Sequence, residues 1–290
     1  METKKIKISV IIPSFNTKQL LRQCLSSLDK KMELIVIDND STDGSQRIVE
    51  SEFPQVKLIK NSKNLGYGAA NNQGIKAAKG DYLLFLNSDT IIKNNAPSKM
   101  AGYLASNPQI GVLGCRLLNK DGSRQASAGW FPSLPVVFIM LFAEHWLGSL
   151  VRGSFKEIKE VDWVMGAAMM VPKKVITKVG MMDESIFMYM DEVEWCWRIK
   201  KAGFKVVFYP EAEIIHLFGA SSKSGRKDPI LNIYRGLIYL YQKHQPSLWQ
   251  LPILKTMLKL KAALVIVLAA LIGNKSLKET YVQAFQITRS

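Results

Sequence analysis

The sequence of 290 residues predicts an α/β fold with a mostly parallel central sheet and helices on both faces. Short apolar runs alternate with helix-periodic segments over residues 6–86, which is the pattern of successive β-α-β units. Strand and helix patterns alternate again over 161–216. Hydrophobic residues make up 48% of the chain and charged residues 22%, so the chain can bury a large core.

The elements of the first block follow one another closely. Residues 6–12 form an apolar run that stops at Pro13, which predicts the first strand. The segment 17–28 then places its apolar residues at helix spacing, with Thr17 as the candidate N-cap. Further buried strands are expected at 33–39, 56–60 and 81–86, with one helix within 41–53 and another over 66–80.

The second block begins after a less regular, partly apolar stretch at 123–160. It is expected to contain a strand region at 161–171, a helix from about Pro172, a helix at 191–202 and a strand at 205–210. The C-terminal part, 246–290, is basic and apolar and is expected to form a helical extension.

Charge and cysteine content narrow the function classes. The net charge of +15 favours an anionic partner such as a phosphate-rich substrate, a nucleic acid or an acidic membrane face. Cys24, Cys115 and Cys196 are far apart and form no C-x-x-C pair, which argues against a disulfide framework and a zinc site. The N-terminus shows no signal-peptide pattern, so we expect the catalytic part in the cytoplasm.

Two carboxylates stand where buried strands are expected to end. Asp38 ends the second strand, and Asp89 follows the fourth one after Asn87 and Ser88. In a parallel sheet these ends border the ligand crevice. Each acid could cap a helix, accept the imide N–H of uracil or thymine, or ligate a hard divalent cation. The sequence contains neither a G-x-G-x-x-G nor a P-loop motif.

Four motifs occur together in a characteristic order. They read ISVIIPSFN at 8–16, ELIVIDNDSTDGS at 33–45, NLGYGAANNQGI at 64–75 and YLLFLNSDT at 82–90. Together they resemble the inverting glycosyltransferase family 2, which has the GT-A nucleotide-diphospho-sugar transferase fold. The resemblance covers about residues 6–222 and is greatest to the rhamnosyltransferase branch that builds bacterial surface polysaccharides.

The resemblance implies a domain organisation. Residues 1–245 would form the GT-A catalytic domain, with a nucleotide-sugar-binding half at 1–120 and an acceptor-binding half at 121–245. Residues 246–290 would form a membrane-associating extension.

The resemblance also implies a divalent cation, Mg²⁺ or Mn²⁺. Asn87-Ser88-Asp89 takes the place of the D-x-D-type motif that binds the metal and the donor diphosphate, with Asp89 as the metal ligand and Asn87 in place of the first acid. The family pattern P-x-A-x-x-x-H matches Pro210, Ala212 and His216, which makes His216 a candidate ligand of the metal or diphosphate. A neutral imidazole is an acceptable ligand for Mn²⁺.

By the same resemblance, several residues would bind the nucleotide sugar. Either Asp38 or Asn39 would recognise the base, and two loops would enclose it. The glycines near residue 66 would let the backbone approach the ligand closely. The full set of candidate nucleotide-sugar-binding residues is Pro13, Ser14, Asn16, Asp38, Asn39, Asn64, Gly66, Asn87, Ser88 and Asp89.

Inverting transfer needs a base that takes the proton of the acceptor hydroxyl. Helix spacing puts Asp191 and Glu194 on one face, with Glu192 pointing elsewhere, and acids in a first helical turn also suit the helix dipole. The resemblance aligns Glu192 with the catalytic base and leaves Asp191 as the alternate. Glu194 would support the helix or a neighbouring arginine, while Arg198 would pair with an acid or with diphosphate.

The tail suggests contact with a membrane. The apolar run 262–272 is too short to span a bilayer, and Lys255, Lys259 and Lys261 lie just before it. We expect a helix in the membrane interface, with a buried core helix as the alternative. The apolar stretch 134–151 would face lipid or shape the acceptor side, and the basic segment 221–226 would close over diphosphate or stay solvated.

These observations predict an inverting, metal-dependent glycosyltransferase. Its donor would be a TDP- or UDP-linked sugar, with TDP-rhamnose as one candidate, and its acceptor polyprenyl-linked or a polysaccharide. The enzyme would be cytoplasmic, held peripherally at the anionic inner face of the cell membrane, and would bind no nucleic acid. The alternatives are a sugar-phosphate nucleotidyltransferase, which should carry a Gly-rich basic loop where this chain has PSFNTKQ, and a basic nucleic-acid-binding protein.

Overall fold

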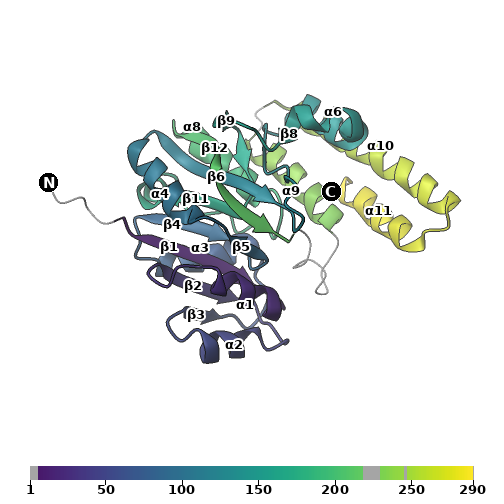
Figure 1. Ribbon diagram of the computed structural model, residues 1–290. Coiled ribbons are helices and arrows are strands. Elements are labelled where there is room, and N and C mark those ends of the chain that lie inside the picture. The colour runs from purple at the N-terminus through teal and green to yellow at the C-terminus, as the bar shows by residue number, and fades with distance from the viewer. Residues whose placement is uncertain (1–5, 218–228, 245–246, 290) are drawn as a thin grey trace.

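The computed structural model describes residues 6–217, 229–244 and 247–289 (Figure 1). The strands of its central sheet are β1 (Ile8–Ser14), β2 (Glu33–Asp38), β3 (Lys57–Lys60), β4 (Tyr82–Leu86), β5 (Thr90–Ile92), β6 (Ile110–Leu118), β9 (Lys159–Val161), β11 (Ala168–Pro172) and β12 (Lys205–His216). They are ordered β3-β2-β1-β4-β11-β6-β12-β5, with β9 paired to β12.

Strand direction divides the sheet into two parts. β3, β2, β1 and β4 are mutually parallel, and β12 is parallel to β6. β11 is antiparallel to β4 on one side and to β6 on the other. The carboxyl ends of β1, β2 and β4 therefore meet at one edge, where an α/β sheet binds its ligands.

Helices cover both faces of the sheet, as the sequence predicts. Strand residues alternate between the faces, so Val10 and Ile12 join one apolar core while Ile11 joins the other. The first core is closed by α1 (Lys18–Ser26), α2 (Ser45–Glu52) and α4 (Ala96–Ser106), and the second by α3 (Tyr67–Ala77), α7 (Lys173–Val179) and α8 (Asp191–Lys201).

A third apolar core lies in a separate group of helices. This group contains α5 (Leu134–Phe138), the π-helix η1 (Ile139–Ala143), α6 (Glu144–Val151), α9 (Pro229–His244), α10 (Gln250–Leu271) and α11 (Lys275–Ile287). Val137, Tyr241 and Leu258 are buried together in it. Figure 1 shows α10 and α11 projecting beyond the sheet. A small sheet is formed by β7 (Ala128–Gly129) and β8 (Arg152–Gly153), which flank 134–151 in the sequence, and by β10 (Trp163–Val164).

Two strands differ from the sequence-based expectation. β1 continues through Pro13 to Ser14, which is possible because β1 pairs with β4 only as far as Ile11, so a residue without an N–H is tolerated. β12 extends six residues beyond the predicted end, to His216. The proposed boundary at 245–246 and the basic segment 221–226 lie outside the described residues.

The three cysteines are buried free thiols, which agrees with their reading as small apolar residues. Burial raises the pKa of each thiol to about 12. They are therefore protonated and unreactive at neutral pH.

Candidate active site

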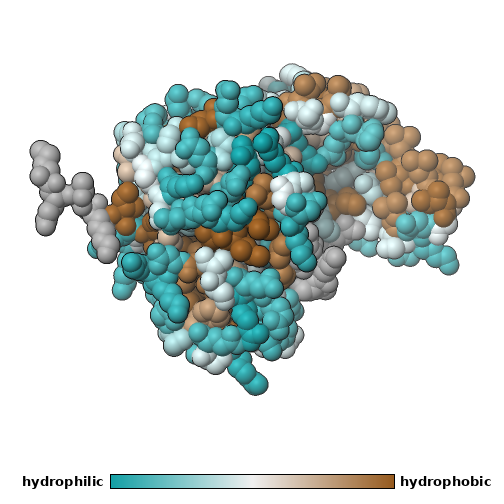
Figure 2. Space-filling view, in the orientation of Figure 1, coloured by the Kyte–Doolittle hydropathy of each residue, from teal (hydrophilic) through white to brown (hydrophobic). Residues whose placement is uncertain are grey.

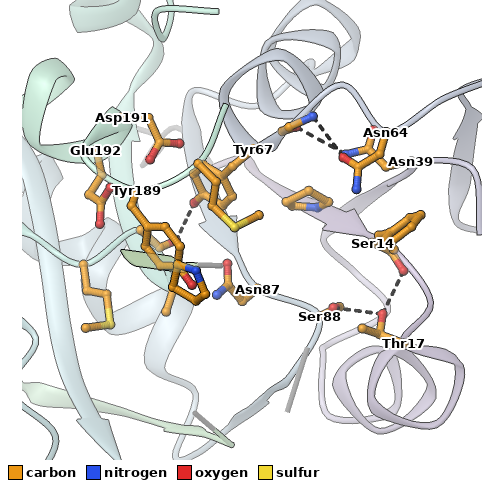
Figure 3. Close-up of a pocket in the computed structure, with 18 of the residues that line it drawn as sticks. Ser14, Thr17, Asn39, Asn64, Tyr67, Asn87, Ser88, Tyr189, Asp191 and Glu192 are labelled. Carbon is orange, nitrogen blue, oxygen red and sulfur yellow. Dashed lines mark hydrogen bonds between the residues drawn. The ribbon is translucent and has the colours of Figure 1, made fainter. Parts of the chain in front are cut away.

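A pocket of about 430 Å³ opens at the carboxyl ends of β1 and β4. Figure 3 shows Ser14, Thr17 and Ser88 on one side of it and Asp191 and Glu192 on the other. The predicted site residues that line it are Pro13, Ser14, Asn39, Asn64, Gly66, Asn87, Ser88, Asp191, Glu192 and His216. Asn16, Asp38 and Asp89 are not among the lining residues.

Three hydroxyl groups form a chain along the N-terminal wall. The Thr17 and Ser14 hydroxyls lie 2.9 Å apart, and Thr17 donates to Ser88 Oγ over 3.0 Å. All three residues are buried. Thr17 occupies the N-cap position of α1, yet its side chain makes no capping hydrogen bond. The threonine expected as a helix cap therefore joins β1 to the segment that follows β4.

The adjacent residues Asp38 and Asn39 face different surroundings. Asn39 lines the pocket, where its Nδ2 donates to the Gly66 carbonyl over 3.3 Å. Asp38 lies behind the wall, and its Oδ1 accepts from Ser41 N at 2.8 Å and Gln46 Nε2 at 2.7 Å. Asp38 Oδ2 is buried and has no hydrogen-bond partner. Of the two candidates for base recognition, Asn39 is the one at the pocket surface.

Neither strand-end acid caps a helix. The N-cap of α2 is Gly44, and strand β5 follows Asp89 directly. Asn16, another predicted ligand residue, has a left-handed backbone (φ 52°), and its side chain accepts from Thr42 N at 2.8 Å. Asn16 thus holds the loop after β2 against the loop after β1.

Gly66 lines the pocket, as expected, and also makes a close backbone contact. Its φ is 89°, and a Cβ at this position would lie 2.3 Å from the Phe187 carbonyl oxygen. Tyr67 N donates to the same carbonyl at 2.9 Å. Glycine at position 66 therefore allows close approach of the loop 180–190, and the expected close approach to a ligand stays a prediction. Asn64 Oδ1 accepts from Gly66 N at 3.0 Å and fixes the turn.

Asp89, which directly precedes β5, lies beside His216 at the end of β12. His216 Nε2 lies 3.4 Å from Asp89 Oδ1, and both side chains are almost fully buried. His216 Nδ1 lies 2.9 Å from Gln125 Oε1. Gln125 Nε2 donates to the His216 carbonyl at 2.6 Å and to Asn119 Oδ1 at 2.7 Å, which fixes the orientation of the amide. The proton of a neutral imidazole is therefore on Nδ1, with Nε2 unprotonated beside Asp89.

This pair suits a divalent cation whose remaining ligands come from elsewhere. A metal-binding histidine commonly donates its second N–H to a carbonyl oxygen, as His216 does to Gln125. In the described part of the chain, no group of three or more His, Cys, Asp or Glu side chains could hold a metal ion. A cation bound by Asp89 and His216 would need oxygen ligands from diphosphate and water.

The first turn of α8 carries the acids of the opposite wall. Tyr189 and Met190, just before the helix, have left-handed backbones with φ of 66° and 68°. Such strain is typical of functional sites. Burial and then the nearby Glu192 carboxylate raise the pKa of Asp191 well above its ordinary value. Asp191 is 2% exposed, and its Oδ2 has no hydrogen-bond partner, whereas Glu192 is only half-buried.

The predicted face of α8 was wrong in one respect. Asp191 and Glu192 line the pocket together, because side chains of a first turn tilt toward the helix N-terminus, which here borders the pocket. Glu194 is buried instead against α9, where it accepts from Lys243 and His244 at 2.9 Å. Arg198 Nε also donates to Glu194 at 2.9 Å, so this arginine pairs with an acid.

A second acid connects the loop 180–190 to α9. Asp183 accepts from Tyr239 at 2.7 Å and from Lys243. Although burial opposes it, these hydrogen bonds hold the pKa of Asp183 well below its ordinary value. Together with Glu194, this contact fixes the start of α8 relative to α9.

Sequence reasoning missed two residues of the site. Tyr67 lines the pocket and donates to the Gly166 carbonyl at 2.6 Å, so it joins α3 to the second half of the chain. Its only signal was the aromatic side chain within a run of small residues. Gln125, which orients His216, lies 91 residues away from it, in a stretch without regular periodicity. No local pattern marks it.

The mixed sheet with a pocket at its strand ends is the GT-A fold of the solved glycosyltransferase structures that it resembles. The chain belongs to glycosyl transferase family 2, whose sequence profile matches residues 9–176. This membership confirms the family expected from the four motifs.

Two relatives illustrate the similarity. The chain is 27% identical over 267 residues to the N-acetylglucosaminyl-diphospho-decaprenol L-rhamnosyltransferase of Mycobacterium tuberculosis, an alignment that covers 83% of this chain and 86% of that protein. It is 24% identical to the low-salt glycan biosynthesis hexosyltransferase Agl10 of Haloferax volcanii, covering 72% of this chain and 66% of the relative.

Solved structures support the fold. The mannosyltransferase PcManGT from Pyrobaculum calidifontis, in complex with GDP-Man and Mn²⁺, matches with a TM-score of 0.52 at 18% identity, covering 99% of this chain and 86% of that one. GalNAc-T7 with UDP, GalNAc and Mn²⁺ matches with a TM-score of 0.59 at 19% identity, covering 81% of this chain and 48% of that one.

Proposed function

We propose that the enzyme transfers a sugar, with inversion, from a nucleoside-diphosphate sugar to a lipid-linked or polymer acceptor in cell-surface glycan synthesis. The observation that carries this proposal is the division of the pocket into a neutral polar wall and an acidic wall. Family membership favours this function over the nucleotidyltransferase and nucleic-acid-binding alternatives. The similarity to a rhamnosyltransferase makes TDP-rhamnose a candidate donor and a polyprenyl-linked sugar a candidate acceptor.

The acids of α8 would carry out the proton transfer. Glu192 is half-buried at the pocket surface and can reach an acceptor hydroxyl, whereas Asp191 is buried with a raised pKa and retains its proton more readily. Glu192 takes the hydroxyl proton as the acceptor oxygen bonds to the anomeric carbon. The bond from that carbon to the diphosphate oxygen breaks on the opposite face, and its electron pair leaves with the nucleoside diphosphate.

Asp89 and His216 would hold Mg²⁺ or Mn²⁺, with Gln125 orienting the imidazole. When bound, the cation supplies positive charge that stabilises the leaving diphosphate. Asn39 and the hydroxyls of Ser14 and Ser88 would meet the nucleotide on the other wall. Asp38 Oδ2, buried and unpaired, could accept the base imide only after the wall in front of it moves.

Calorimetry with UDP-, TDP- and GDP-sugars, with and without Mn²⁺, tests the proposal. We expect one nucleotide class to bind in the presence of Mn²⁺ and to lose most of its affinity in EDTA. Transfer would then be measured by release of the nucleoside diphosphate on adding a polyprenyl-diphosphate sugar. Absence of binding to every nucleotide sugar with either metal would refute the proposal.

A further inference from the structure

The helical group carries an apolar surface that no described residue covers. Fourteen of the 17 exposed large hydrophobic side chains in the described residues lie within 134–151 or 247–289. Figure 2 shows brown, hydrophobic atoms gathered on α6 and on the far end of α10. A soluble domain rarely exposes so concentrated an apolar surface without a partner.

Helix α10 is apolar on two opposite faces. One face packs into the helical core through Leu254, Leu258 and Ala262, each 0% exposed. The other face is open to solvent, and its residues recur at helix spacing. They are Leu260, Leu264, Val267, Leu268 and Leu271, exposed between 55% and 78%. The alternative prediction, a buried core helix, therefore describes only one of the two apolar faces of α10.

The segment Leu134–Val151 extends the surface. By length and composition it is the one helical stretch of the described chain apolar enough to cross a membrane, yet only 17% of it is buried. Its η1 part packs on α10. Trp146 and Leu150 are 76% and 62% exposed. Tryptophan is enriched where proteins meet the membrane–water interface.

Charge identifies the partner as an anionic lipid surface. Residues 246–290 contain six Lys or Arg and one Glu. Lys259 and Lys261 flank Leu260 at about 100° on either side of the open face, where their amines can reach headgroups while the leucines enter lipid. A second copy of this surface would bring equal positive charges together, which disfavours self-association.

We infer that α10 and the helical stretch 134–151 dock this enzyme on the surface of an anionic bilayer. The docking surface lies next to the active site, because α9 lines the pocket through Pro229 and Ile233 and packs on α10, where the Tyr234 hydroxyl donates to the Leu258 carbonyl. The inference deepens the proposed function, since a lipid-linked acceptor would then reach the pocket along the membrane. Vesicle binding itself needs neither donor nor acceptor, so the two proposals can fail separately.

Co-sedimentation of the full chain with vesicles tests the inference. Vesicles of phosphatidylcholine alone are compared with vesicles containing phosphatidylglycerol, at low and high salt. The triple variant Val267→Ser, Leu268→Ser, Leu271→Ser should lower the partition coefficient by roughly tenfold or more at both salt concentrations. The double variant Lys259→Gln, Lys261→Gln should lower the partition coefficient by about fivefold for each lysine removed. This decrease should appear only with phosphatidylglycerol-containing vesicles at low salt.

The matched control is Lys30→Gln, Lys31→Gln, which removes the same charge from exposed positions between α1 and β2. It should leave vesicle binding nearly unchanged. None of the altered positions lines the pocket, so each variant should keep the donor affinity of the unaltered enzyme. Equal vesicle binding by all variants would overturn the inference. So would a dimer in solution that the serine variant separates into monomers without losing vesicle binding. A protein that can be removed from membranes only with detergent, and not with salt, would span the bilayer and would also overturn it.

Discussion

The two walls of the pocket differ in charge and in the state of their polar groups. On the N-terminal wall, the hydroxyls of Ser14, Thr17 and Ser88 are neutral and bonded to one another. On the α8 wall, Asp191 is a buried acid with an unpaired oxygen and a raised pKa, preceded by two left-handed residues. The side chains of the first wall are held in position by their own hydrogen bonds. The second wall has a strained backbone and a carboxyl group with a shifted pKa, which are features typical of catalytic sites.

The two walls also differ in how their side chains are held in position. Ser14 and Ser88 are positioned by neighbouring strand ends of the same sheet. Asp191 and Glu192 depend on α8, and α8 is held by Glu194 and Asp183 against α9. Disruption of α9 should therefore harm catalysis more than nucleotide binding.

The largest effect is expected at Glu192. Glu192→Gln should lower kcat by about 10²–10⁴-fold, because the amide cannot take the hydroxyl proton. Donor affinity measured by calorimetry should stay within about twofold, since the N-terminal wall is intact. Asp191→Asn serves as the comparison. A fully active Glu192→Gln together with an inactive Asp191→Asn would assign the base to Asp191.

The next largest effect is expected at Gln125. Gln125→Leu removes the acceptor of the His216 Nδ1 proton and should weaken Mn²⁺ binding by about 10–100-fold. Titration of Mn²⁺ followed by electron paramagnetic resonance measures this. The exposed Gln23→Leu on α1 is the control and should bind Mn²⁺ normally. Unchanged Mn²⁺ affinity in Gln125→Leu would exclude His216 as an oriented ligand.

A smaller effect concerns stability. The pKa of Asp191 is raised in the folded state, so its ionisation disfavours folding as pH rises above the ordinary carboxyl pKa of about 3.9. Asp191→Asn should therefore raise Tm at pH 8, by about 2–4 °C. The gain should shrink as pH falls toward 4 and vanish well below it, where the unaltered side chain is neutral in both the folded and the unfolded state. Scanning fluorimetry across this range measures it, and a variant less stable at pH 8 would contradict the strained-wall interpretation.

The smallest effect is expected on the binding wall. Thr17→Val keeps the side-chain shape and removes the hydroxyl that joins Ser14 to Ser88. The variant loses both hydrogen bonds of this hydroxyl, but the freed Ser14 and Ser88 hydroxyls can still bond to the donor, so we expect a net loss of about 1 kcal/mol, a fall of about fivefold in donor affinity, and little change in kcat. Calorimetry and steady-state kinetics separate the two quantities. A large fall in kcat would mean that a change on the N-terminal wall also alters the acids of the α8 wall.

Much of the fold was predictable because its signals are local. Strand runs at 33–39 and 81–86 and the helix spacing at 17–28 correspond to β2, β4 and α1 within a few residues. The polar residues that end those strands marked the edge of the sheet where the pocket lies. The sheet register then decided which of them face the pocket, and Asp38 does not while Asn39 does.

The sequence by itself determined the fold class, the family and the acids on which catalysis would depend, because periodicity and short motifs need only neighbouring residues. Only the tertiary structure placed Gln125 behind His216, turned Glu194 toward α9, and left one face of α10 uncovered by any described residue. These facts depend on segments distant in the chain. Hydrogen bonding and burial between such segments follow from packing, which no local pattern encodes.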